Sequence, residues 1–272
     1  MPLDLQKALN AISDVTENRP LPLREFDQIY MKAGDMVIHT EFVARRFDGL
    51  DVVFVGDGDA IGLAVVHLMK QEIVRYGPKS VTLLDFDERM VNSVERFATD
   101  WDYGEDVIRA RLYNVIDAFP EDLVGAFGAF HINPPWGQHN EGESVAVFLE
   151  RGIQALSVGG LGMVVIADDK ELPWTNQVLG RTQQVALSNG MIVEEMIPAL
   201  HTYHLDDAPE LRSCALTFRK VADDAIANES LPGERLANFY GRTQTMRVRY
   251  VRERANARQA PMESYALETL EE

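Results

Sequence analysis

From about residue 50 to residue 220, short apolar runs alternate with stretches that have the periodicity of a helix. Strands are predicted at 51–56, 80–85, 107–113, 126–132, 160–168, 191–200 and 211–220. Helices are predicted at 60–77, 88–101, 143–156 and 175–190. Near-continuous apolar strands separated by helices are typical of parallel sheets that are covered on both faces. The chain is therefore expected to be an α/β protein with a doubly wound, mostly parallel sheet.

Three parts are expected along the chain. Residues 1–45 precede the sheet and are predicted to form an N-terminal helical or lid segment, residues 46–222 a catalytic domain, and residues 223–272 an arginine-rich helical tail. The tail's arginines are Arg235, Arg242, Arg247, Arg249, Arg252, Arg254 and Arg258. Because the whole chain has a net charge of −17, the tail is expected to dock on its own body or on a second copy in a homodimer.

Composition excludes several classes of protein. The one cysteine, Cys214, rules out an internal disulfide framework and suits a reducing compartment. No stretch reaches the ~18 apolar residues of a membrane span, and the start MPLDLQKALN lacks the apolar core of a signal peptide. A cytoplasmic protein without membrane contact is expected. Its negative charge repels nucleic acid and attracts cations, which favours a small cationic amine as partner.

The ends of three predicted strands are where a ligand is expected. In open α/β sheets, ligands bind outside the carboxyl ends of the strands. Those ends are followed here by Gly56–Gly62, Asp85–Glu88 and Asn133–Trp136. All three segments are expected to meet in one crevice.

The first of these loops, VGDGDAIG, has the glycines of a nucleotide-binding turn. Ile61 stands where the dinucleotide fingerprint needs its third glycine, and two carboxylates beside a helix start disfavour a phosphate, so NAD is not expected. A sulfonium and ammonium ligand such as S-adenosylmethionine fits better. The aspartates would repel its carboxylate, which favours decarboxylated S-adenosylmethionine. The cofactor-binding residues predicted in this loop are Gly56, Asp57, Gly58 and Asp59.

Further cofactor ligands are predicted after the next two strands. Asp85 ends its strand where an acid can accept hydrogen bonds from both ribose hydroxyls of an adenosine. Asp87 follows as a second ligand or as the cap of the next helix. Asn114 is expected to hold the adenine amino group, or else to sit in a turn.

The third loop, INPPW, stiffens the chain just after a strand. Two consecutive prolines can neither continue a sheet ladder nor enter a helix, so the side chain before them is held still. Asn133 is therefore expected to be held in a fixed position at the crevice.

Weaker candidates flank this crevice. Asp168 and Asp169 follow a strand at the same edge and would bind an amine, or form an exposed turn. His131 and His139 are proton shuttles or ordinary histidines. His201 and His204 have helical metal-ligand spacing but lie in a proline-broken segment without a third ligand, so no metal is expected.

In this order and spacing, VGDGDAIG, LLDFDER and INPPW resemble the class I S-adenosylmethionine-dependent methyltransferase fold, a Rossmann-like fold with a seven-stranded sheet. A wider stretch, roughly residues 26–220, resembles the N4-bis(aminopropyl)spermidine synthase (branched-chain polyamine synthase) family. It includes FDQIYMKAGDMVIHTEFVARRF, AFPEDLVGAF, FLERGIQAL and PALHTYH.

The resemblance implies aminopropyl transfer from decarboxylated S-adenosylmethionine to a polyamine nitrogen. The family usually has Asp-Pro-Pro after the fourth strand, and that aspartate holds and helps to deprotonate the amine; Asn133 occupies this place here. Asparagine can only accept a hydrogen bond from the amine. Asn-Pro-Pro-aromatic is also the signature of N-methyltransferases acting on adenine N6 and on glutamine amides. These resemblances imply that Asn133, Pro134 and Trp136 are catalytic together with Asp59, with Trp136 as a stacking or cation–π surface for the substrate. N-methyl transfer and a non-catalytic binding subunit of the same fold are the alternatives.

Overall fold

A seven-stranded sheet forms the centre of the molecule, in the order β3-β2-β1-β4-β5-β7-β6. The computed structural model describes residues 3–205, 208–223, 226–241, 247–254 and 265–270. The strands are β1 Asp51–Val55, β2 Ser80–Asp85, β3 Ile108–Leu112, β4 Phe127–Ile132, β5 Leu156–Ala167, β6 Met191–Thr202 and β7 Arg212–Lys220. The first five strands pair in parallel, and β7 is antiparallel to both of its neighbours. The predicted doubly wound, mostly parallel sheet is confirmed.

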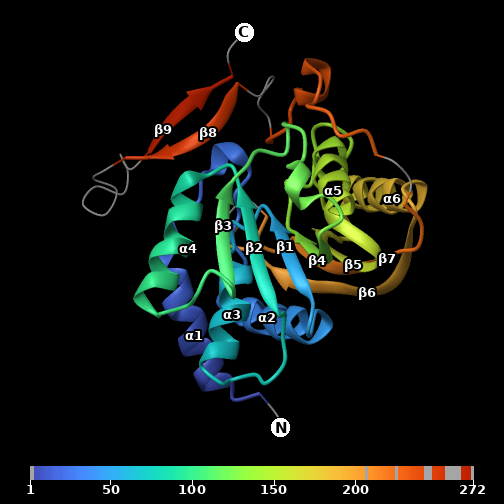
Figure 1. Ribbon diagram of the computed structural model, residues 1–272. Helices are drawn as coiled ribbons and strands as arrows, with labels where there is room; N and C mark the ends of the chain where they lie inside the picture. Colours follow the sequence, from blue (N-terminus) through green and yellow to red (C-terminus); the bar gives the residue numbers. More distant parts are fainter. Residues whose placement is uncertain (1–2, 206–207, 224–225, 242–246, 255–264, 271–272) are drawn as a thin grey trace.

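Helices cover both faces of the sheet (Figure 1). They are α1 Leu5–Asn18, α2 Ala33–Arg46, α3 Ile61–Lys70, α4 Glu88–Asp100, α5 Glu143–Ala155 and α6 Pro173–Ser188. Successive side chains of a strand point to opposite faces. In β1, Val52 and Phe54 pack into the core beneath α1–α4, whereas Val53 and Val55 pack into the core beneath α5 and α6. Both faces therefore demand apolar residues, which explains the unbroken apolar run.

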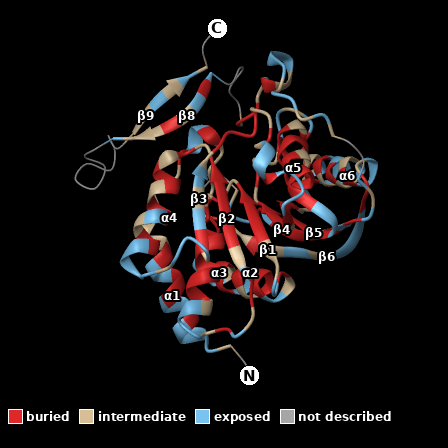
Figure 2. Cartoon of the chain, viewed as in Figure 1, coloured by how far each residue is buried: buried red, intermediate tan, exposed pale blue. Residues whose placement is uncertain are grey.

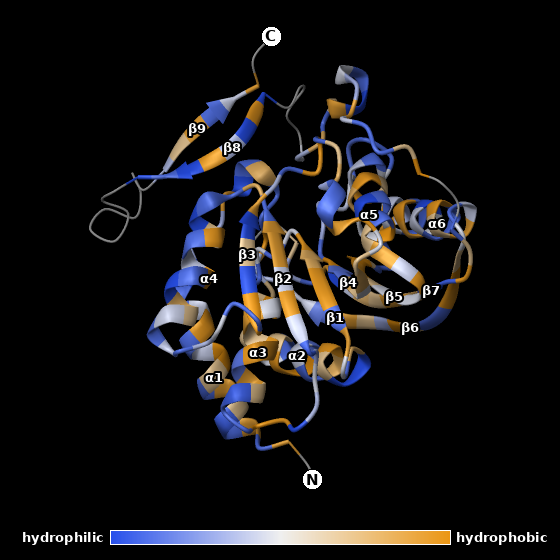
Figure 3. Ribbon diagram, in the orientation of Figure 1, coloured by the Kyte–Doolittle hydropathy of each residue, from blue (hydrophilic) through white to orange (hydrophobic). Residues whose placement is uncertain are grey.

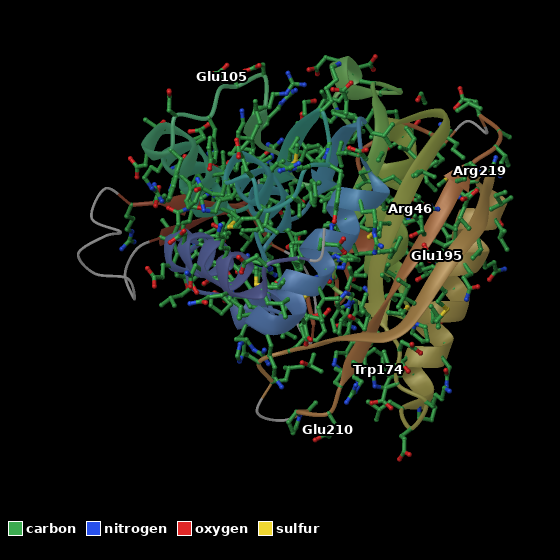
Figure 4. The ribbon with its side chains drawn as sticks, turned by 90° about the horizontal axis from the view of Figure 1, so that it is seen from below. Arg46, Glu105, Trp174, Glu195, Glu210 and Arg219 are labelled. Atoms are coloured by element: carbon green, nitrogen blue, oxygen red, sulfur yellow. The ribbon has the colours of Figure 1, made fainter. Side chains whose placement is uncertain are left out.

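Burial follows this layering. The inner strands β1 and β2 are buried and apolar along most of their length (Figures 2 and 3). The edge strand β6 is mostly exposed between its ends. On β6, Glu194 binds Arg46 of α2 and Arg219 of β7, and Figure 4 labels both arginines beside these strands. These charges occupy the open sheet edge, a common protection against edge-to-edge pairing.

The N-terminal helices share the core of the sheet. Ile12 and Val15 of α1 and Met36 and Val43 of α2 are fully buried in the same apolar cluster as α3. The chain between α1 and α2 includes the 3₁₀ helix η1, Arg24–Phe26. Residues 5–18 and 33–46 are thus helical, and both helices pack against the sheet in one apolar core.

Two predicted helices differ from the structure. The helix expected at 60–77 ends at Lys70, because Glu72 adopts a left-handed conformation with φ 55°. The prediction that the tail is helical is wrong for its described part. That part contains an antiparallel pair, β8 Val248–Glu253 and β9 Tyr265–Thr269, and short 3₁₀ turns. Half of the run VRYVRE is β-branched or aromatic, a composition that favours a strand.

The described part of the tail contacts the body of the same chain, one of the two arrangements expected from its arginines. Arg252 of β8 binds Glu88 of α4 at 3.0 Å, and Glu253 binds Arg96 of the same helix at 2.8 Å. Within the described residues, no helix is long and apolar enough to cross a lipid bilayer.

Candidate functional site

A cavity of about 730 Å³ lies at the carboxyl ends of β1, β2 and β4. A volume of this size is typical of sites for small ligands. Its walls include segments 24–30, 84–86 and 133–139, the first loop and residues 240–241 of the tail. The crevice predicted from the strand order is therefore present, and the chain segments from before and after the sheet complete it.

The first loop turns tightly at Gly56, whose φ of 71° favours glycine. Gly56, Gly58 and Asp59 line the cavity, but the fully buried Asp57 does not. The Asp57 carboxylate accepts hydrogen bonds from the backbone N–H of Ile61 at 2.9 Å and of Gly62 at 2.7 Å. The expectation that Asp57 binds the cofactor is corrected: its oxygens hold the start of α3.

Asp59 joins three parts of the chain beneath the cavity. Its Oδ1 accepts from the backbone N–H of Met31 at 2.7 Å, and its Oδ2 accepts from Nδ2 of Asn133 at 2.8 Å. The guanidinium of Arg19 lies 3.6 Å from Oδ1. Burial raises the pKa of Asp59, and the charge of Arg19 opposes that rise. Two hydrogen bonds and the nearby guanidinium of Arg19 therefore stabilise the Asp59 carboxylate where the first loop meets the proline loop.

Sequence reasoning missed Arg19, which follows α1 directly. Its guanidinium lies 3.9 Å from the centre of the Tyr30 ring and donates to the backbone oxygen of Asp59 at 3.1 Å. Tyr30 in turn donates from its hydroxyl to the backbone oxygen of Pro20 at 2.8 Å. These contacts fasten the segment between α1 and α2 over the first loop. No local sequence signal marks them.

Asp85 lies at the end of β2 and lines the cavity, as predicted. Its two oxygens accept from the backbone N–H of Asp57 at 3.1 Å and of Asp87 at 2.9 Å. Burial, followed by the charge of Asp87, raises the pKa of Asp85 to about 7. Asp87 is the helix cap rather than a ligand, since it accepts from the backbone N–H of Arg89 and forms an ion pair with that side chain at 2.6 Å.

An aromatic wall stands beside Asp85. The ring of Phe86 stacks on Tyr240 at 5.2 Å, and Phe26 meets Phe86 edge-on at 5.4 Å. All three residues line the cavity. A carboxylate acceptor next to flat apolar rings is an arrangement that suits a ribose and an adenine, so the residues present fit an adenosyl group.

Asn114 does not line the cavity. It is fully buried, its Nδ2 donates to the backbone oxygen of Arg249 at 2.6 Å, and its Oδ1 accepts from the backbone N–H of Ile116 at 3.2 Å. The prediction that Asn114 binds the adenine is therefore wrong, and the alternative, that it holds a turn, is what the structure shows.

The proline loop forms one wall of the cavity through Asn133, Pro134, Pro135 and Trp136. The bond from Asn133 to Asp59 fixes the orientation of its amide, because Nδ2 is the donor. Its Oδ1 is left as the acceptor. Trp136 packs edge-on against Tyr203 at 5.2 Å with an interplanar angle of 81°. The loop thus presents an acceptor oxygen and an aromatic surface to the cavity.

Asp168 and Asp169 lie outside this cavity, in a separate surface hollow. Oδ2 of Asp168 accepts from the backbone N–H of Ala199 at 2.9 Å, and Oδ1 of Asp169 accepts from that of Glu171 at 2.9 Å. Their predicted role in binding the amine of the main cavity is corrected: both hold turns, the alternative that the sequence left open.

Three buried histidines form a chain behind the proline loop. Nε2 of His131 lies 2.8 Å from Nε2 of His39, and Nδ1 of His39 lies 2.9 Å from Nε2 of His201. From His201 the chain continues through Ser213 at 2.8 Å to the hydroxyl of Tyr203 at 2.7 Å. Burial lowers the pKa of all three histidines, to about 3 for His131 and about 4 for His201.

The other predicted histidines have different surroundings. His139 lines the cavity and His204 is exposed. His201 lies in a strand, so the helical spacing considered for a metal site does not exist. Among the residues that the structure describes, no group of three potential ligands could hold a metal ion.

A family model described as the branched-chain polyamine synthase A C-terminal domain matches residues 7–267. The chain belongs to this family. The match confirms the family resemblance and extends it beyond residues 26–220 at both ends.

Curated relatives include the N(4)-bis(aminopropyl)spermidine synthases of Methanocaldococcus jannaschii and Thermococcus kodakarensis. Each is 28% identical to this chain over a stretch that covers 56% of this chain. The chain covers only 40% of each relative.

A solved structure has the same fold, that of the branched-chain polyamine synthase from Thermus thermophilus in complex with N4-aminopropylspermidine and 5′-methylthioadenosine. Its TM-score is 0.70 with 21% identity, covering 88% of this chain and 70% of that one. The [4+2]-cyclase SpnF shares the fold more distantly, with a TM-score of 0.52 and 14% identity over 70% of this chain and 82% of that one. The fold is thus of the class I methyltransferase type.

Proposed function

We propose that the chain transfers an aminopropyl group from decarboxylated S-adenosylmethionine to a secondary or primary nitrogen of a polyamine. The observation that carries this proposal is the charge of the cavity. Four carboxylates line it, those of Glu25, Asp27, Asp59 and Asp85, against one arginine, Arg24. A cavity of this sign attracts a donor that carries a sulfonium and an ammonium, and an acceptor with several amines.

Residues of the second and first loops would hold the donor. Asp85 would accept from the ribose hydroxyls, with the adenine beside Phe86 and Tyr240. Asp59 would face the donor's ammonium group. The same carboxylate would repel the additional carboxylate of intact S-adenosylmethionine, which supports the decarboxylated donor. The relatives' names and the methylthioadenosine in the Thermus thermophilus complex support a donor of this type.

The proline loop would hold the acceptor. The bound donor supplies an electrophilic carbon next to a sulfonium, a good leaving group. The attacking nitrogen forms the new N–C bond as the C–S bond breaks, and the electron pair of that bond goes to sulfur. Oδ1 of Asn133 would accept an N–H of the neutral amine and so aim its lone pair.

Asn133 cannot remove the proton, because an amide is not a base at neutral pH. The chain would therefore select the neutral form of the reacting nitrogen. The proton that the new ammonium then releases would pass to water through the cavity mouth. Trp136 would cover the amine with its ring face, a contact that also favours ammonium groups.

A second function is favoured by Asn133 itself. Asn-Pro-Pro-aromatic orients a planar amino group in N-methyltransferases, so methyl transfer from intact S-adenosylmethionine to an amine or to adenine is the alternative. The two functions differ in the donor that they need.

Calorimetric titration of the chain with each donor separates them. Binding of the decarboxylated donor at least tenfold tighter, about 1.4 kcal/mol, supports aminopropyl transfer. Incubation with spermidine should then yield 5′-methylthioadenosine and an aminopropylated product by mass spectrometry. Tighter binding of the intact donor, with methylated products, would replace the proposal with the alternative. Binding without any transfer would indicate a binding subunit.

A further inference from the structure

Asp27 is a cavity residue that the proposed reaction has not used. It follows the 3₁₀ helix η1 in a left-handed conformation with φ 59°, and its backbone N–H donates to the oxygen of Arg24 at 3.2 Å. This conformation is uncommon for residues other than glycine, although aspartate tolerates it better than most. The turn therefore fixes the place of the Asp27 side chain in the cavity wall.

The four cavity carboxylates differ in their partners. Asp59 and Asp85 each accept two hydrogen bonds from the protein, and Asp59 also faces Arg19. Glu25 accepts from the hydroxyl of Tyr265 at 3.3 Å. Asp27 has no hydrogen bond or ion pair from its side chain to any residue that the structure describes.

The surroundings of Asp27 make this lack of partners costly. Burial raises the pKa of its carboxyl, and the charges of Arg24 and His139 only partly oppose the rise. Asp27 is half-buried, and a partly desolvated carboxylate without a hydrogen-bond partner is stabilised when a positive charge comes near it. In a cavity, that charge can come from the ligand.

The position of Asp27 indicates which part of the ligand it meets. Asp59 and Asn133 lie together at the first loop, where the reacting nitrogen and the donor tail are proposed to meet. Asp27 and His139, which is three residues beyond Trp136 in the sequence, line the same cavity, and the charges of Arg24 and then His139 act on the Asp27 carboxyl. Asp27 therefore lines the cavity without joining the bonded pair of Asp59 and Asn133 at the reacting centre.

We propose that Asp27 binds a second, charged nitrogen of the acceptor and so selects amines that carry an ammonium group remote from the reacting nitrogen. This inference rests on the proposed function and names its acceptor class. Spermidine is such an acceptor. Dipropylamine has a comparable secondary nitrogen but no remote ammonium, so it is the matched probe.

The experiment compares Asp27→Asn with the wild type and with Asp102→Asn. Asp102 is a good control because it also has a left-handed conformation, φ 56°, and also follows a helix, with its N–H donating to Thr99, but it is exposed and does not line the cavity. Each chain is titrated with 5′-methylthioadenosine, and then with spermidine or dipropylamine at saturating 5′-methylthioadenosine.

The wild type and Asp102→Asn should bind spermidine at least about tenfold more tightly than dipropylamine, the range of a hydrogen bond to a charged group. Asp27→Asn should lose this preference and keep its affinity for 5′-methylthioadenosine. It should also unfold at the same temperature as the wild type or higher, since the lost charge has no partner.

An unchanged preference for spermidine in Asp27→Asn would overturn the inference. A separate titration with decarboxylated S-adenosylmethionine tests the donor side: weaker binding of this donor by Asp27→Asn, with unchanged spermidine binding, would place Asp27 at the donor and would also overturn the inference. A lower unfolding temperature together with weaker binding of every ligand would show a structural role and would also overturn it. A wild type that binds 5′-methylthioadenosine but no amine would overturn the proposed function, and this inference with it.

Discussion

Asn133 donates from Nδ2 to Oδ2 of Asp59 at 2.8 Å, and this bond joins the loops after β4 and β1. An amide has one donor end and one acceptor end, so binding the carboxylate with the donor end commits the oxygen to the other side. An aspartate at position 133 would have placed a second carboxylate against Asp59. With asparagine at position 133, the two loops carry a single negative charge, that of Asp59, and a neutral acceptor, Oδ1 of Asn133.

Replacing Asn133 by alanine removes this acceptor and leaves Oδ2 of Asp59 without a donor. We expect kcat for aminopropyl transfer to fall by about 100-fold, the usual loss for one hydrogen-bonding group at a reacting centre. The KM for the donor should change little, because the ribose and adenine contacts lie elsewhere. Single-turnover release of 5′-methylthioadenosine measures the step directly. An unchanged kcat would remove Asn133 from the mechanism.

Arg19 should stabilise the fold through Asp59. Its side chain is only 10% exposed, and the Asp59 side chain 1%. Arg19→Met keeps much of the apolar packing on Tyr30 but leaves a buried carboxylate without its cation, so we expect a loss of about 3 kcal/mol in the free energy of unfolding. Urea denaturation at pH 8 measures this loss.

Arg45→Met is the matched control for Arg19→Met. The Arg45 side chain is 63% exposed and pairs with Glu41 at 3.4 Å on the surface of α2. Exposed pairs contribute little, so this variant should differ from the wild type by less than about 0.5 kcal/mol. Equal effects of the two substitutions would contradict the special role of the Arg19–Asp59 pair.

Asp85 should make nucleoside binding depend on pH near neutrality. Its pKa is about 7, and only the carboxylate can accept from both ribose hydroxyls. The affinity for 5′-methylthioadenosine should therefore fall as the pH drops through 7, by about tenfold between pH 8 and pH 6. Calorimetric titration across this range measures the profile. Asp85→Asn should bind weakly with a flat profile; a flat profile in the wild type would exclude Asp85 as the ribose ligand.

The sequence predicts the ends of β1, β2 and β4 well because these strands are buried along almost their whole length and must be apolar on both faces. For this reason Gly56, Asp59, Asp85 and the proline loop could be placed at one crevice. It does not reveal whether a loop carboxylate faces the cavity or its own backbone. The Asp57 side chain turns away from the cavity because the first backbone N–H groups of α3 need an acceptor. No earlier helical turn supplies a carbonyl oxygen for them, so the Asp57 carboxylate accepts their hydrogen bonds.

Other site residues could not be predicted because tertiary packing alone brings them in. Arg19 and Tyr30 precede the sheet, and Tyr203 follows β6, yet all three lie beside the first loop or the proline loop. Tyr240 reaches the cavity from the tail. The arginine-rich tail suggested a docked helix, whereas Val248–Glu253 forms a strand whose buried residues are Val248 and Val251.

The histidine chain should make the fold sensitive to acid. The pKa of His201 is about 4 in the folded chain and near 6.5 when unfolded, so between these values the unfolded chain binds more protons. The stability that this group contributes is complete above pH 6.5 and is lost as the pH falls toward 4. For His201 we expect a loss of roughly 2 kcal/mol between pH 8 and pH 5.

His201→Asn isolates this contribution. Asparagine can still bond to Ser213 but does not titrate, so the variant should be less stable than the wild type at pH 8 and lose less stability on going to pH 5. Asp85 acts in the opposite direction: its raised pKa makes the folded chain bind more protons below pH 7, so the comparison must be between the two chains rather than between two pH values. Urea denaturation of both chains at pH 8, 6.5 and 5 gives the difference. If the free energy of unfolding of both chains changed equally with pH, His201 would not be held neutral in the fold. One histidine of the hydrogen-bonded chain from His131 to Tyr203 would then be charged.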